Sequence, residues 1–185
     1  MVTLMSLWLP ILLSAVAVFI VSSLIHMLLP YHRSDFSKLP AEDNVMTALG
    51  NTIPVGEYMF PYSGSMAAMK DPAWIEKRKR GPAGLLTVMP SGMPGMGKFL
   101  AQWFVYSVVV SVIVAHLATG ALHSGAAAAE LFHLTAISAF LAYGFASIQA
   151  SIWYSRAWSV TLKALFDAAL YGATTGAVFV WLWPK

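Results

Sequence analysis

Three histidines and one glutamate lie close together in the stretch AHLATGALHSGAAAAELFH, residues 115–133. Glu130 and His133 are spaced i, i+3, which places both side chains on one face of a helix. Paired histidines can ligate a haem, a single histidine can ligate a chlorin pigment, and histidines with a carboxylate can bind a metal ion. The pattern indicates cofactor binding by His116 and His133, or a metal site formed by His116, His123, Glu130 and His133.

The same residues also have an ordinary interpretation, in which histidines near a membrane surface hydrogen-bond to neighbouring helices, water or lipid headgroups. No H-E-x-x-H pattern of a zinc hydrolase is present. A carboxylate-bridged di-iron site would need glutamates from further helices. We therefore expect no cofactor and no catalytic residue. Binding of a haem, a chlorin pigment or a metal is the alternative.

A second set of polar residues surrounds Asp167, in the apolar stretch KALFDAALYGATTG. Lys163 precedes Asp167 by one helical turn, and His26 lies at a comparable depth near the end of another apolar stretch. An ionisable residue inside a membrane is by default a candidate functional site. We expect a structural polar pair drawn from His26, Lys163 and Asp167, with His26 close to Asp167. A proton or ion pathway is the alternative.

The elements that position these residues follow from composition. The chain has 185 residues, of which 58% are hydrophobic and 10% charged, against about 25% charged in soluble proteins. Crossing a bilayer takes about 20 apolar residues, and four stretches are long enough: 7–29, 99–122, 131–153 and 160–183. The sequence predicts an all-α integral membrane protein with one transmembrane domain over residues 1–185. It has no cysteine, which excludes disulfides and thiolate catalysis.

The distribution of basic residues predicts the orientation. Of the eleven Lys and Arg residues, all but Lys185 fall in the segment 30–98 or at the turn between the third and fourth stretches. The positive-inside rule places both regions in the cytoplasm, with the two termini and the histidine-bearing loop outside. The tryptophans near the ends of the stretches agree with this orientation, because tryptophan prefers the membrane interface.

The predicted cytoplasmic loop, residues 30–98, is rich in proline and glycine, so it cannot form one long helix. Short helices are expected at 40–50 and 71–81, with the remainder extended or turn-rich. The loop also carries a tryptophan and a basic run, which we expect to bind anionic lipid headgroups: Trp74, Lys77, Arg78, Lys79 and Arg80. An acidic face of a partner protein is the alternative, and nucleic acid is disfavoured.

Gly172 and Gly176 form a G-x-x-x-G pattern, which predicts a close contact between two helices, within the chain or with a partner.

Three stretches, LIHMLLPYHRSDFSKLPAEDNVM, MGKFLAQWFVYSVVVS and SIWYSRAWSVTLKALFDAALYG, together resemble a group of uncharacterised bacterial inner-membrane proteins of similar length and span number. The resemblance implies a four-span fold in the bacterial inner (cytoplasmic) membrane. It brings no assigned activity and no functional residues.

These observations predict a non-catalytic accessory or structural subunit of a larger membrane complex, such as a respiratory or photosynthetic (reaction-centre or light-harvesting) assembly. Its expected partners are anionic lipids and other membrane subunits. Two alternatives stay open: a small redox protein with haem or metal bound by the outer histidines, and a transporter of small solutes.

Overall fold

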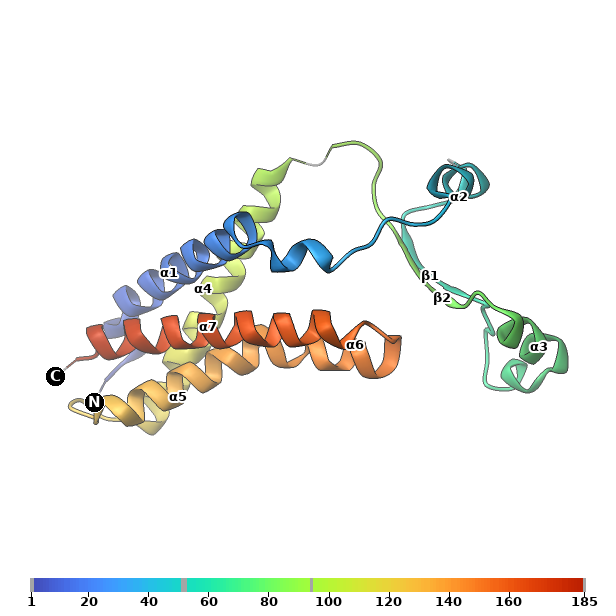
Figure 1. Cartoon of the computed structure of the whole chain (residues 1–185). Coiled ribbons are helices and arrows are strands. Elements are labelled where there is room, and N and C mark those ends of the chain that lie inside the picture. The colour runs from blue at the N-terminus through green and yellow to red at the C-terminus, as the bar shows by residue number, and fades with distance from the viewer. Residues whose placement is uncertain (1, 51–52, 94, 185) are drawn as a thin grey trace. The chain divides into compact units, whose positions relative to one another are not determined.

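Figure 1 shows a computed structural model of the chain, which describes residues 2–50, 53–93 and 95–184. The chain divides into two units. One comprises residues 1–36 and 95–185, and the other comprises residues 37–94.

The first unit is a bundle of long helices. Its elements are η1 (Leu4–Leu7), α1 (Trp8–Leu28), η2 (Pro30–Ser34), α4 (Met96–Ala121), α5 (Ala128–Phe140), the π-helical η4 (Leu141–Phe145), α6 (Ser147–Tyr154) and α7 (Trp158–Leu182). In the described residues, four helices are long and apolar enough to cross a membrane: Leu4–Leu28, Met96–Ala121, Ala128–Tyr154 and Trp158–Leu182. This agrees with the predicted helical class and with the predicted number of membrane-length helices.

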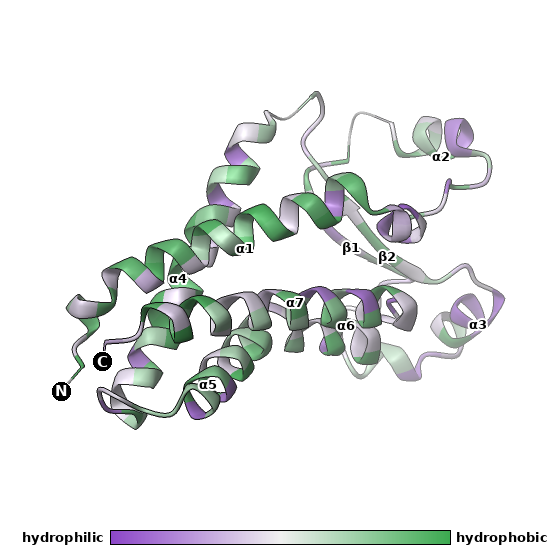
Figure 2. Cartoon of the chain, turned by 60° about the vertical axis from the view of Figure 1, so that its left-hand side comes forward, coloured by the Kyte–Doolittle hydropathy of each residue, from purple (hydrophilic) through white to green (hydrophobic). Residues whose placement is uncertain are grey.

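The burial pattern of the bundle differs from that of a soluble protein in two respects. Small hydroxyl side chains occupy fully buried positions, namely Ser14, Ser107, Ser111, Thr135, Thr161 and Thr175, each 0% exposed. Large apolar side chains such as Ile20, Ile113 and Trp181 are exposed. Figure 2 shows hydrophobic colouring along α1. Small residues between helices and large apolar residues outside are typical of helices packed in lipid.

Close packing of α5, η4 and α7 depends on glycines. A Cβ atom on Gly172 would lie 2.6 Å from the backbone oxygen of Ala136, and one on Gly176 would lie 2.9 Å from the ring of Phe132. A Cβ on Gly144 would lie 2.4 Å from the Cβ of Ala168. The G-x-x-x-G pattern of α7 therefore serves a helix contact within this chain.

The bundle has two distinct ends. At one end, which we call the turn end, the indole nitrogen of Trp183 donates to the backbone oxygen of His123 at 3.1 Å. This bond ties the end of α7 to the turn between α4 and α5. At the opposite end, the loop end, α1 finishes and α7 begins, and the Ser151 and Thr161 hydroxyls lie 2.6 Å apart across the α6–α7 turn.

The second unit contains α2 (Glu42–Leu49), β1 (Gly56–Phe60), η3 (Ala68–Lys70), α3 (Pro72–Arg80) and β2 (Gly84–Val88). The strands β1 and β2 pair antiparallel, with Gly56 opposite Val88. The helices α2 and α3 lie where the sequence predicts short helices, and they end at Gly50 and Gly81, whose φ angles are 58° and 65°. Both strands lie in chain that the sequence predicts to be extended or turn-rich, but the sequence analysis does not predict that they pair.

Candidate functional site

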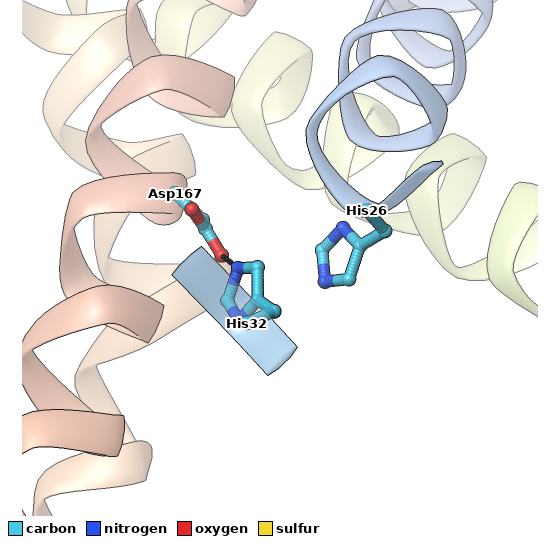
Figure 3. A group of neighbouring side chains, drawn as sticks. All are labelled: His26, His32 and Asp167. Carbon is cyan, nitrogen blue, oxygen red and sulfur yellow. Dashed lines mark hydrogen bonds and ion pairs between the residues drawn. The ribbon is translucent and has the colours of Figure 1, made fainter. Parts of the chain in front are cut away.

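A group of metal-ligating side chains lies at the loop end of the bundle (Figure 3). His26, His32 and Asp167 each offer a ligand atom, and these atoms lie within 4.8 Å of one another. Asp167 is buried, His32 is half-buried and His26 is exposed. No other group of three or more such residues occurs in the part of the chain that the structure describes.

Local sequence explains how these residues meet. His26 lies in the last turn of α1, and the helix ends at Leu28 before the extended residue Leu29. Pro30 follows, and the residue before a proline is disfavoured in helical conformation. The chain then forms the short turn η2, which places Tyr31 and His32 against α7.

Asp167 accepts hydrogen bonds on both carboxylate oxygens. The hydroxyl of Tyr31 donates to Oδ1, and the ring nitrogen Nε2 of His32 lies 2.8 Å from Oδ2. The side chain of Asp167 is 7% exposed. A buried carboxylate needs such donors, because an unpaired charge in this environment is strongly unfavourable.

The network continues from His32 to Asp35 and Lys163. The second ring nitrogen of His32, Nδ1, lies 2.7 Å from Oδ2 of Asp35. The ammonium of Lys163 donates to Oδ1 of Asp35 at 2.7 Å. The same ammonium donates to the backbone oxygen of Tyr31 at 2.6 Å and to the hydroxyl of Ser34 at 2.7 Å. Through these hydrogen bonds, Lys163 holds residues 31–35 against the start of α7.

Two groups of the network have displaced pKa values with clear causes. The hydrogen bonds from Lys163 and then from His32 hold the pKa of the Asp35 carboxyl below its usual range. Burial, followed by the hydrogen bond to Asp167, raises the pKa of the Tyr31 hydroxyl. Asp35 therefore stays charged and Tyr31 stays a proton donor at neutral pH.

His26 contacts the network through its ring. The rings of His26 and His32 are stacked, with centroids 4.5 Å apart and planes at 9°. Nδ1 of His26 lies 2.9 Å from the backbone oxygen of Ser22. A carbonyl oxygen only accepts, so Nδ1 carries the proton and Nε2 of the neutral ring keeps its lone pair.

An apolar groove of about 600 Å³ adjoins His26, between α1 and α4. Its walls are formed by Ser22, Ser23, His26, Met27, Met96, Leu100 and Trp103. The indole nitrogen of Trp103 donates to the Ser22 hydroxyl at 2.8 Å, which connects the two walls.

Two of the three polar residues predicted from the sequence to lie together do so, and the third has a different partner. His26 and Asp167 lie in one group, whereas Lys163 forms its ion pair with Asp35 and not with Asp167. Tyr31, His32 and Asp35 also belong to this network and were not predicted from the sequence. Their signal was the cluster PYHRSD directly after the first span, where polar side chains can fold back onto the bundle.

The four outer residues lie at the turn end. His116 is on α4, His123 is in the turn, and Glu130 and His133 are on α5; all four are exposed. They form no group of three or more ligands among the residues described. Binding of a haem or pigment by His116 and His133 stays a prediction.

The predicted lipid-binding residues lie on α3. Lys77, Arg78, Lys79 and Arg80 are exposed, and Trp74 is half-buried. Lys79 pairs with Glu76 at 3.2 Å. An exposed run of cations fits an anionic surface, and lipid binding stays a prediction.

The second unit exposes most of its apolar side chains. Of its described residues, only Pro61 is buried. Tyr62, Met66 and Met93 are 78%, 76% and 99% exposed. A groove of about 550 Å³ on the strand pair is lined by Glu57, Tyr58, Met59, Tyr62 and Leu85.

Comparison with protein-family models, with curated proteins and with solved structures finds no match.

Proposed function

We propose that this protein is a non-catalytic accessory subunit of a larger membrane complex. Its four long helices lie in the bilayer, and residues 37–93 dock on a partner protein at the cytoplasmic face. The observation that supports this proposal is that only one of the second unit's described residues, Pro61, is buried.

A unit of this kind is poorly stabilised by its own contacts. A single pair of strands is marginally stable in water, and helices as short as α2 and α3 need tertiary packing. The described residues of this unit (37–50 and 53–93) nevertheless expose many large apolar side chains: Leu39, Met46, Val55, Met59, Phe60, Tyr62, Met66, Met69, Leu85, Met89 and Met93. Exposed apolar surface of this extent is typical of a protein–protein contact.

The chemistry of this surface fits a protein partner. Methionine and aromatic side chains are enriched at protein interfaces, and the groove lined by Tyr58, Met59 and Tyr62 offers a pocket for an apolar side chain. The basic run of α3 supports a second contact, to anionic headgroups, at about 1 kcal/mol per charge.

The polar network at the loop end supports a structural role for the bundle. Lys163 and Asp167 hold residues 31–35 against α7. The point at which the chain leaves the bundle is therefore fixed, which restricts the reach of the docking segment.

The test is purification of the full chain from its host membranes after mild crosslinking, with identification of co-purifying chains. We expect a partner protein to co-purify with the wild-type chain in a fixed molar ratio. The double variant Tyr62→Ser, Met66→Ser should lose it. Met5→Ser is the matched control, because Met5 is 82% exposed but lies in the first unit.

A wild-type protein that crosslinks only to lipid, or only to itself, contradicts the proposal. Equal loss of the partner in the Met5→Ser control would also contradict a role for the second unit.

A further inference from the structure

We propose that His26, His32 and Asp167 bind one first-row divalent transition metal ion at the loop end of the bundle. This inference goes beyond the proposed function and does not depend on it, since all three residues belong to the first unit.

The donor set defines the class of ion. Imidazole nitrogens suit zinc, iron, copper and nickel, whereas calcium and magnesium prefer oxygen ligands. Two histidines and one carboxylate also leave coordination positions open for water or a small ligand, as in catalytic zinc sites and non-haem iron sites. The site therefore differs from a closed structural zinc site.

Each ligand residue is oriented by a partner on its other polar atom. Nδ1 of His32 bonds to Asp35, Nδ1 of His26 bonds to the Ser22 carbonyl, and Oδ1 of Asp167 accepts from Tyr31. Metal-ligating histidines almost always donate their second nitrogen to a carboxylate or backbone carbonyl, and ligating carboxylates are themselves hydrogen-bonded. The structure shows this arrangement around all three residues.

Metal binding requires a rearrangement, because the hydrogen bond between Nε2 of His32 and Oδ2 of Asp167 must be replaced by a bond from each atom to the ion. Two ligand atoms at about 2.0–2.1 Å from a tetrahedral ion lie about 3.3 Å apart, and Nε2 of His32 lies 2.8 Å from Oδ2 of Asp167. The stacked rings must also change, because an imidazole lone pair lies in the ring plane and two parallel rings cannot aim at one ion. His26 is the ring that tilts, because it is exposed and lies beside the open groove.

The experiment uses the full chain in mild detergent with a purification tag that contains no histidine. The protein is stripped with a chelator, loaded with Zn²⁺ or, without oxygen, Fe²⁺, and desalted. Metal content is then measured by mass spectrometry and affinity by competition with a chromophoric chelator. We expect about one ion per chain, as for a single three-ligand site, and no retention of Mg²⁺.

Variants separate metal binding from folding. His26→Ala should weaken binding by more than about 100-fold, and Asp35→Asn by about 10–100-fold, as is usual for the partners of metal ligands. His26 is exposed and has no ion pair, so its replacement should leave the helical content seen by circular dichroism unchanged. His133→Ala is the matched control, since it removes an exposed histidine at the turn end.

A wild type that retains neither ion overturns the proposal. So does full retention by His26→Ala, or a loss in His133→Ala as large as in His26→Ala.

Discussion

The Asp35–Lys163 pair differs from the surface ion pairs of the chain. Its side chains are 13% and 21% exposed, whereas those of Glu76 and Lys79 are 74% and 69% exposed. Exposed pairs contribute about 0–1 kcal/mol, whereas removing one partner of a buried pair costs about 3–5 kcal/mol. The Asp35–Lys163 pair lies between these limits.

We predict that Lys163→Ala lowers the free energy of unfolding by about 2 kcal/mol, since Asp35 then loses its cation while it stays half-buried. Lys79→Ala should change it by less than about 0.5 kcal/mol. Unfolding of the purified protein in detergent measures both values. Equal effects of the two substitutions would show that burial of the pair does not matter.

Asp167 could be predicted from the sequence as a candidate site, but most of its hydrogen-bond partners could not. Asp167 was predictable as a candidate site because a carboxylate in an apolar helix is rare. Its proximity to Lys163 followed a local helix rule, but the actual partner of Lys163 is Asp35, 128 positions away. Such pairing depends on how α1 packs against α7, which no local pattern encodes.

At the scale of elements, glycines let α7 pack closely against α5 and η4. At Gly172 the obstacle to a side chain is the backbone of α5, which cannot move aside as a flexible side chain can. Gly120 on α4 has nothing within 4 Å of its Cβ position. Substitution of Gly172 by alanine therefore tests helix packing, whereas the same substitution at Gly120 tests only the backbone preference for a helix.

We predict that Gly172→Ala destabilises the protein by about 1–3 kcal/mol, because overpacking forces α5 and α7 apart. Gly120→Ala should be neutral or stabilising by up to about 1 kcal/mol, because alanine favours the helix. Thermal unfolding in the same detergent compares them. If the Gly172→Ala and Gly120→Ala variants were equally stable, the helices α5 and α7 would be able to move apart at little cost.

The elements themselves were predictable to different degrees. The four long helices followed from hydropathy, with ends displaced by only a few residues, as for α5, which begins at Ala128. The strands β1 and β2 were missed. They are separated by residues 61–83, so the short-turn signals that identify a hairpin are absent.

At the scale of the whole molecule, the four helices and the distribution of cations define a proposed orientation. The second unit, with the basic run of α3, should lie on one side of the membrane and the α4–α5 turn on the other. The chain has no cysteine, so a single introduced thiol reports its own location.

We predict that Ser124→Cys reacts with a membrane-impermeant maleimide on intact cells stripped of their outer wall. Lys79→Cys should react only after the membrane is opened. Both side chains are exposed, so the labelling pattern reports on which side of the membrane each position lies. The reverse pattern would invert the orientation, and labelling of both from one side would refute the four-span arrangement.

The network at the loop end joins residues that are synthesised far apart, since His32 and Asp167 are 135 positions apart. During biogenesis, Asp35 and His32 leave the ribosome long before Lys163 and Asp167. Until α7 enters the bilayer, the carboxylate of Asp35 has no ammonium partner and the segment after α1 has no helix to lie against. The contacts that hold residues 31–35 in place can therefore form only after α7 has been synthesised.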